Sequence, residues 1–198
     1  MKLKISPFFF IVWIAALVFG KTDTILHLFL CAAFHEAAHL CAFYAFGANV
    51  GTLEILPFGI SAKLSGAANM SHNQEIFAFL AGPLANIVAA GFCLLAQWLI
   101  SGNIDLYGLD IMLVCNLAFA IINLYPVYPL DGGRVIYCLL EKHLSLKKAE
   151  TISLIISYIF LVPLLIFGIM LIIYTGFNFS LLMIFGYLLL YLLIKGFN

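Results

Sequence analysis

The sequence predicts an all-α polytopic membrane protein of about six transmembrane helices, with a small membrane-associated β-hairpin. Hydrophobic residues make up 65% of the chain and charged residues only 9%, whereas soluble domains are about half apolar and about a quarter charged. Apolar stretches close to the ~20 residues that cross a bilayer recur throughout, and one stretch, 49–65, mixes apolar with polar residues. The 198 residues leave no room for a second globular domain, so we expect one transmembrane domain over 1–198.

The apolar stretches define the expected spans, which cover residues 5–20, 24–46, 75–100, 107–140, 151–174 and 179–194. The first is short and follows Lys2 and Lys4, so a cleaved signal peptide is the alternative reading. Because no A-x-A-like cleavage site follows and the next stretch begins almost at once, we favour a retained helix.

Charge predicts the orientation. With a cytoplasmic N-terminus, all lysines except Lys21 fall on the cytoplasmic side, as the positive-inside rule requires. An even number of spans then places the C-terminus in the cytoplasm as well.

The net charge of zero and the lack of a basic tract exclude nucleic acid as a partner. The five cysteines form no C-x-x-C pair and lie in apolar surroundings, so we read them as buried side chains.

The mixed stretch 49–65 reads NVGTLEILPFGISAKLS and has Pro57 and Gly59 at its centre, which predicts a strand, a turn and a second strand. Open strands cannot sit in lipid, so this hairpin is expected at the cytoplasmic interface or against protein. Downstream, Ser71 and Gln74 have capping-box spacing ahead of the third span.

Small residues repeat every four positions in the third span, at Ala78, Gly82, Asn86 and Ala90. This spacing lets helix backbones approach closely, and we read the face mainly as a packing surface. Asn86 differs, because an amide in the membrane needs a partner. That partner is a neighbouring backbone or a substrate, and the sequence leaves both open.

Chemistry enters at His35, Glu36 and His39, which form an H-E-x-x-H pattern inside the second span. On a helix, positions i and i+4 share a face, so both imidazoles can bind one zinc ion. Glu36 lies beside them and can take a proton from a water molecule bound to the metal. Ionisable residues in a membrane are costly and usually mark function. The alternative is a pair of histidines hydrogen-bonded within a helix bundle.

A catalytic zinc takes three protein ligands and keeps one position open. Asp131 is the best third ligand, because it lies within the fourth span in the stretch NLYPVYPLDGG, residues 123–133. On an unbroken helix it would lie about 36 Å from the start of its span, well past the histidines at about 17 Å along theirs. Pro126 and Pro129 disfavour helix, however, so a break near residue 123 and a restart after Asp131 resolve the mismatch. The alternative is a kinked helix with Asp131 paired to Arg134.

Together the stretches HEAAH, AGPLAN and NLYPVYPLDGG resemble the site-2 protease family of intramembrane zinc proteases, over roughly residues 30–140. The compact layout and the turn at 57–59 most resemble the branch of stage IV sporulation protein FB, without that branch's C-terminal regulatory domain. The resemblance implies a bacterial cytoplasmic membrane and regulated intramembrane proteolysis of a membrane-associated protein substrate. It implies one Zn²⁺ per chain held by His35, His39 and Asp131, with Glu36 as the catalytic acid/base. Asn123 is then a candidate for holding the substrate or the oxyanion.

Several alternatives stay open. A metal-ion transporter would also use intramembrane histidines, although it has no specific need for Glu36. An inactive scaffold would have no need of an intact metal site. Residues 53–56 of the hairpin could receive an extended substrate by strand addition. Asn86, Asn116 and Asn123 could line a polar path for water, although hydrogen bonds between helices would explain the same residues. A regulatory membrane partner and the oligomeric state are left undecided.

Overall fold

The computed structural model describes residues 2–5, 14, 17–18, 22–56, 59–65, 70–100, 107–176 and 179–196. The chain divides into two compact units, Met1–Asn123 and Leu124–Asn198. Among the described residues, three apolar helical segments are long enough to cross a membrane, at Ile25–Ala45, His72–Leu99 and Leu146–Thr175. The chain is therefore a helical membrane protein. The predicted first span, 5–20, lies almost entirely outside the described residues.

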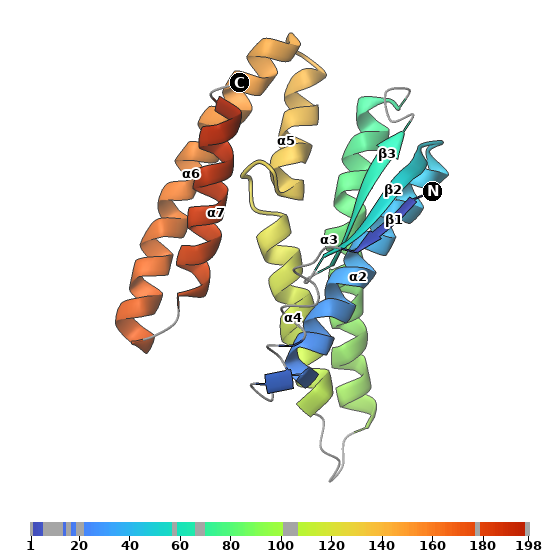
Figure 1. Cartoon of the computed structure of the whole chain (residues 1–198), viewed down its shortest axis with the longest axis vertical. Helices are drawn as coiled ribbons and strands as arrows, with labels where there is room; N and C mark the ends of the chain where they lie inside the picture. The colour runs from blue at the N-terminus through green and yellow to red at the C-terminus, as the bar shows by residue number, and fades with distance from the viewer. Residues whose placement is uncertain are drawn as a thin grey trace. The chain divides into compact units, whose positions relative to one another are not determined.

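The elements whose bounds the structure gives in the first unit are labelled in Figure 1: β1 (Lys2–Ile5), α2 (Thr22–Ala45), β2 (Asn49–Leu56), β3 (Gly59–Ser65), α3 (His72–Leu99) and α4 (Tyr107–Asn123). Helices α2, α3 and α4 pack against one another. Phe43 of α2 packs edge-on against Phe79 of α3, with ring centroids 5.5 Å apart. This contact sits in a buried cluster with Ala48 and Ala78.

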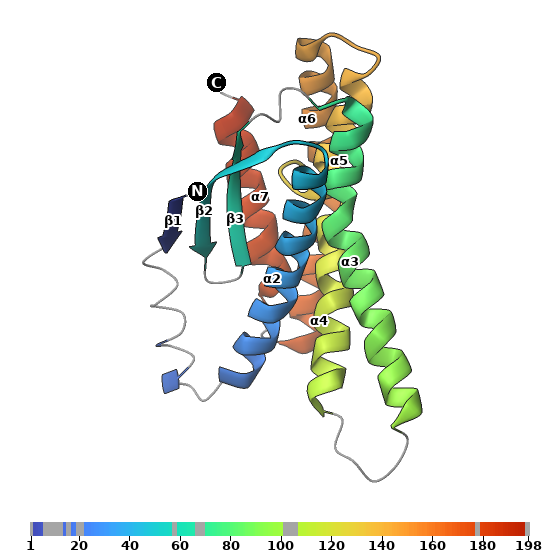
Figure 2. The same cartoon turned by 90° about the vertical axis from the view of Figure 1, so that its right-hand side faces the viewer.

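The strands form one sheet in the order β1-β2-β3, beside α2 (Figure 2). β2 and β3 pair antiparallel, with a register irregularity between Val50 and Thr52, and the first two residues of the turn predicted at 57–59 lie outside the described residues. β1 pairs parallel with β2, from Lys2 opposite Thr52 to Ile5 opposite Ile55. Ile5, expected to open the first span, is thus the end of a strand. An extended N-terminal segment satisfies the backbone groups that the free edge of β2 would otherwise leave unpaired.

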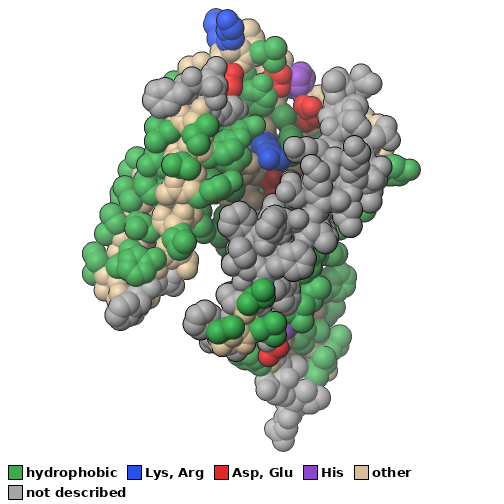
Figure 3. Space-filling view, viewed as in Figure 1, with side chains coloured by type: hydrophobic (Ala, Val, Ile, Leu, Met, Phe, Trp, Pro, Cys, Tyr) green, Lys and Arg blue, Asp and Glu red, His purple; other side chains and the backbone are tan. Residues whose placement is uncertain are grey.

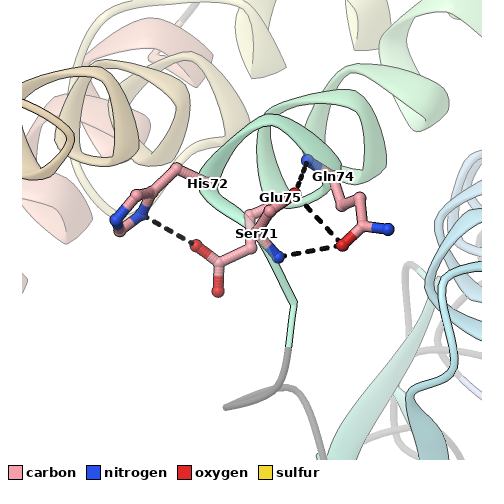
Figure 4. A network of polar contacts seen from close by, with 4 residues as sticks. All are labelled: Ser71, His72, Gln74 and Glu75. Atoms are coloured by element: carbon pink, nitrogen blue, oxygen red, sulfur yellow. Dashed lines mark hydrogen bonds and ion pairs between the residues drawn. The ribbon is translucent and has the colours of Figure 1, made fainter.

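Helix α3 begins at the capping box that the sequence predicts (Figure 4). The backbone N–H of Ser71 donates to Gln74 Oε1 at 2.9 Å, and the backbone N–H of Gln74 donates to the Ser71 hydroxyl at 3.4 Å. Two donors that a helix start leaves without partners are satisfied in this way. His72 and Glu75 lie beside the capping box, with His72 Nδ1 3.8 Å from Glu75 Oε2.

The second unit consists of α5 (Asp131–Glu141), α6 (Leu146–Thr175) and α7 (Ser180–Gly196). Its core is a cluster of fully buried side chains from the turn before α5, from α6 and from α7: Val127, Leu161, Leu188 and Leu192. The outer faces of α6 and α7 are covered with hydrophobic side chains (Figure 3), among them Ile166, Phe167 and Ile173. A solvent-facing helix would not carry such a surface, and lipid accounts for it.

The predicted fourth span, 107–140, is two helices. α4 ends at Asn123 and α5 begins at Asp131, as the proline-broken stretch predicts. Gly132 and Gly133 follow directly, and neither has a positive φ. A Cβ on Gly132 would collide with the carbonyl of Leu124, and one on Gly133 with the backbone of Val127. Both glycines therefore let the first turn of α5 lie directly against the irregular segment 124–130.

Candidate metal centre

His35 and His39 lie one turn apart on α2 and point their rings at the same place. Their ring centroids are 4.7 Å apart and their Nε2 atoms 3.1 Å apart. Both side chains are buried, with 3% and 8% of their surface exposed. The spacing in the sequence thus brings two potential ligand nitrogens together inside the protein.

The other ring nitrogen of each histidine is bonded to α3. His39 Nδ1 lies 2.7 Å from the backbone carbonyl oxygen of Ala78, and His35 Nδ1 lies 2.5 Å from Asn86 Oδ1. A carbonyl oxygen only accepts hydrogen bonds, so His39 Nδ1 must carry the proton. Nε2 of a neutral His39 therefore presents a lone pair.

The same conclusion holds for His35 through the side chain of Asn86. Asn86 is fully buried, and one end of its amide faces the backbone carbonyl of Cys31 at 3.3 Å. That end must be the NH₂ group, because a carbonyl cannot donate. The oxygen end then faces His35 Nδ1, which must donate to it. Both histidines consequently turn an Nε2 lone pair toward one point.

Two lone pairs 3.1 Å apart repel each other, and a shared cation turns that repulsion into binding. Tetrahedral zinc with Zn–N bonds of about 2.0–2.1 Å separates two nitrogen ligands by about 3.3 Å. The spacing of the histidines is close to this value. Hydrogen bonds from Nδ1 to a carbonyl or amide oxygen are also the usual outer support of zinc-binding histidines.

Gly82 lets the backbone of α3 lie close to the Nε2 atoms of the two histidines. A Cβ at this position would lie 2.7 Å from His35 Nε2 and closer still to His39 Nε2. Any side chain at position 82 would therefore enter the volume that a metal ion needs. Gly82 stands midway between Ala78 and Asn86 on the same face of α3, and these three residues form the wall opposite the histidines.

Glu36 directly follows His35 on α2 and is only partly buried, unlike the two histidines. The place of the H-E-x-x-H pattern inside a predicted span implies burial of all three side chains, and Glu36 departs from that prediction. The glutamate is thus more accessible than the two histidines beside it.

Asp131 and Asn123 flank the break between α4 and α5. Asp131 is the first residue of α5 and is buried, with 6% of its surface exposed. Asn123 is the last residue of α4 and partly buried, and its Nδ2 donates to the Phe119 carbonyl of its own helix at 3.0 Å. Asn123 belongs to the first unit and Asp131 to the second.

The wall formed by α3 was the part of the site that sequence reasoning missed. The four-residue spacing places Ala78, Gly82 and Asn86 on one face of α3, and the sequence indicates mainly a packing surface there, with Asn86 as the exception that needs a partner. The proposed water path does not fit Asn86 and Asn116, which are buried and bonded to each other, with Asn86 Nδ2 donating to Asn116 Oδ1 at 2.7 Å. Hydrogen bonds between helices explain these two residues.

Comparison with known proteins gives consistent matches. The profile of Peptidase family M50 matches residues 103–165. The chain is 28% identical over 162 residues to stage IV sporulation protein FB of Bacillus subtilis, covering 81% of this chain and 55% of that protein. It is 27% identical over 144 residues to the zinc metalloprotease MJ0392 of Methanocaldococcus jannaschii, covering 72% and 42% respectively. The chain thus spans about half the length of these relatives.

Among solved structures, the chain is similar to the site-2 protease from Methanocaldococcus jannaschii. The TM-score is 0.69 with 21% sequence identity, over 94% of this chain and 86% of that one. This likeness establishes a shared fold. The profile match includes the helix break and Asp131, whereas His35 and His39 lie before it.

Proposed function

The chain belongs to the site-2 protease family, peptidase family M50, and on that premise we propose that it is an intramembrane zinc metalloprotease. It would hydrolyse peptide bonds in or near membrane segments of other proteins. The observation that carries the proposal is the pair of Nε2 lone pairs aimed at one point in front of Gly82. A scaffold or a packing interface has no use for such a point.

The proposed ligand set is His35, His39 and Asp131, holding one zinc ion per chain. For Asp131 the support is its buried carboxylate, its place directly after the helix break, and the family's motif at 123–133. When bound, zinc supplies a Lewis acid that polarises a water molecule and the scissile carbonyl.

Glu36 is the proposed general base and acid. Its carboxylate takes a proton from the attacking water and passes it to the leaving amine. Asn123 is the proposed contact for the substrate or the oxyanion. An amide NH₂ has two hydrogens, and the bond to the Phe119 carbonyl uses one of them, so the other is available for a substrate oxygen.

The hairpin is the proposed receiver of the substrate, because a peptide bond must leave its helix before it can be cleaved. The expectation that residues 53–56 receive it is wrong in one respect. β2 is the central strand, and both of its edges are already paired. Among the described strands, β3 pairs on one side only, and it lies against the catalytic helix α2. We therefore assign strand addition to the outer edge of β3.

The remaining proposals concern topology and context. About six spans with both termini in the cytoplasm would place the hairpin at the cytoplasmic face. The two units would act together as one metalloprotease domain over 1–198. A membrane-associated protein is the proposed substrate, and a regulatory membrane protein is a candidate partner. A place in sporulation is suggested only by the Bacillus relative.

The test is Glu36→Gln. Membrane-anchored reporter proteins are co-expressed with the wild type or the variant, and cleavage is followed by immunoblot while zinc content is measured on the purified chain. We expect cleavage to fall by about 10²–10⁴-fold, the usual contribution of a general base, with zinc content unchanged. Glu150→Gln, an exposed change on α6, is the control.

Two results would count against a protease. Reporter cleavage that persists in Glu36→Gln would show that Glu36 is not the general base. Zinc flux into vesicles carrying the wild type, retained in Glu36→Gln and without cleavage of any reporter, would favour the transporter instead.

A further inference from the structure

Behind the histidines, a second buried amide lies one step further from the proposed metal. Asn116 of α4 has 2% of its surface exposed, and its Oδ1 accepts from Asn86 Nδ2 at 2.7 Å. Its own Nδ2 lies 2.8 Å from the Met112 carbonyl and 3.2 Å from Cys31 Sγ. The contacts of this amide thus link α4 to α2 and α3.

The orientation of Asn116 follows from the Met112 carbonyl. A backbone carbonyl cannot donate, so the end of the amide that faces it must be NH₂. The opposite end, which faces Asn86, is therefore oxygen. An oxygen there accepts only from the NH₂ end of Asn86, and this leaves the Asn86 oxygen facing His35.

The distances decide which contact holds Asn86 in place. The bond from Asn86 to the Cys31 carbonyl is 3.3 Å, beyond the usual N–H···O range of 2.7–3.2 Å, whereas the bond to Asn116 is 2.7 Å. Without Asn116, only the long contact would oppose a flip of the Asn86 amide. A flipped amide would present NH₂ to His35 Nδ1, move the imidazole proton to Nε2, and abolish the lone pair that faces the metal.

We propose that Asn116 is a positioning residue that sets the tautomer of His35 through Asn86 and so tunes metal binding. The inference rests on the proposed zinc function. It predicts that Asn116 affects zinc affinity although it touches neither metal nor substrate. The alternative is that Asn116 merely fastens α4 to α3, in which case its removal would change stability and leave affinity alone.

The experiment measures zinc affinity by competition with a chromogenic chelator on the purified full chain, together with the visible spectrum of the Co²⁺-substituted protein. Asn116→Leu removes the acceptor with little change in volume. Asn116→Ser also removes it, but its hydroxyl can still bond to the Met112 carbonyl within α4, so it serves where leucine prevents folding. We expect about 10-fold weaker zinc binding in both, the lower end for an outer-shell change, and an altered Co²⁺ spectrum. Asn116→Asp retains an acceptor oxygen and should bind zinc within about 3-fold of the wild type.

The decisive comparison is a double-mutant cycle. Asn86→Leu should weaken zinc binding by about 100-fold, because it removes the partner of His35 itself. If Asn116 acts through Asn86, Asn116→Leu in that background causes no further loss. Wild-type affinity in both Asn116→Leu and Asn116→Ser, or independent losses that multiply in the double variant, would overturn the inference. A wild-type chain that binds no zinc would instead overturn the proposed function.

Discussion

At the scale of single residues, the wall of α3 serves the histidines in three different ways. Ala78 contributes its backbone carbonyl, Gly82 contributes the lack of a side chain, and Asn86 contributes an amide oxygen. The H-E-x-x-H pattern could be read from the sequence because its chemistry is in the side chains. The contribution of Ala78 could not be read from the sequence, because every residue carries a carbonyl. Only the packing of α2 on α3 determines that the carbonyl of Ala78 contacts His39.

Gly82→Ala tests the wall. The added methyl group would enter the space between the Nε2 atoms, so we expect zinc affinity to fall by more than about 100-fold, beyond the effect of losing an outer-shell partner. Chelator competition on the purified chain measures it. Gly91→Ala is the matched control, because a Cβ at Gly91 on the same helix meets nothing within 4 Å.

Alanine is favoured over glycine in a helix by roughly 1 kcal/mol, so neither change should weaken α3 itself. Equal zinc affinities in the two variants would mean that the metal lies elsewhere.

At the scale of elements, the break between α4 and α5 was predictable and its anchoring was not. Pro126 and Pro129 mark residues where helix is disfavoured, and local chemistry of this kind is visible in a sequence. The anchors come from α6, about 30 residues further on. The Tyr128 N–H donates to the Ser157 hydroxyl at 2.9 Å, and the Tyr125 hydroxyl donates to the Phe160 carbonyl at 2.7 Å. The apolar sequence of α6 contains no pattern that predicts these contacts.

Ser157→Ala would remove the hydroxyl that accepts the Tyr128 N–H in a partly buried site. Because a donor left without its acceptor away from water costs about 1–3 kcal/mol, we expect a lower midpoint of thermal unfolding in detergent. Thr151→Ala is the control, because this exposed hydroxyl donates to the Lys147 carbonyl of its own helix. Matching midpoints for the two variants would show that the contact from α6 does not hold the segment.

The sheet is a second case in which an element was predicted and its neighbours were not. The mixed apolar and polar stretch centred on Pro57 and Gly59 predicts two strands, whereas the pairing of Lys2–Ile5 with β2 depends on segments about 50 residues apart. That pairing excludes β2 as the receiving strand and leaves the outer edge of β3.

Proline substitutions along β3 test this edge. Backbone N–H groups alternate in direction along a strand, so either Ile60 and Ala62 or Ser61 and Lys63 face outward. Proline removes the N–H, and we expect one alternate pair to block reporter cleavage while leaving zinc affinity unchanged. The other pair should disrupt the bonds to β2. Cleavage that tolerates proline at all four positions would exclude strand addition at β3.

At the scale of the whole molecule, the functional motifs are divided between two compact units. The first unit holds His35, Glu36 and His39, and the second begins just before Asp131. The polytopic helical class followed from composition alone, because a chain with 65% hydrophobic residues has few other ways to fold. The division into two units did not follow from the composition, because it depends on which helices pack together.

Asp131→Ala tests whether the second unit supplies a ligand. A ligand that binds only the folded state at 100 times its dissociation constant stabilises it by about 2.7 kcal/mol. We expect zinc to raise the unfolding midpoint of the wild type, and this shift to be largely lost in Asp131→Ala. Asp110→Ala is the control, an exposed aspartate of α4 that accepts from Gln97. A full zinc-induced shift in Asp131→Ala would exclude this residue as a ligand.

The wall of α3 also predicts which substitutions this helix can accept during evolution. Ala78, Gly82 and Asn86 lie one turn apart on the same face, yet they tolerate different replacements. Position 78 accepts whatever fits its fully buried volume, since only its carbonyl is used. Position 82 accepts glycine alone, and position 86 requires an amide whose two ends face different partners. Among distant relatives, the first position should therefore vary only among residues about as small as alanine, the second should not vary, and the third should change only together with its partner at 116.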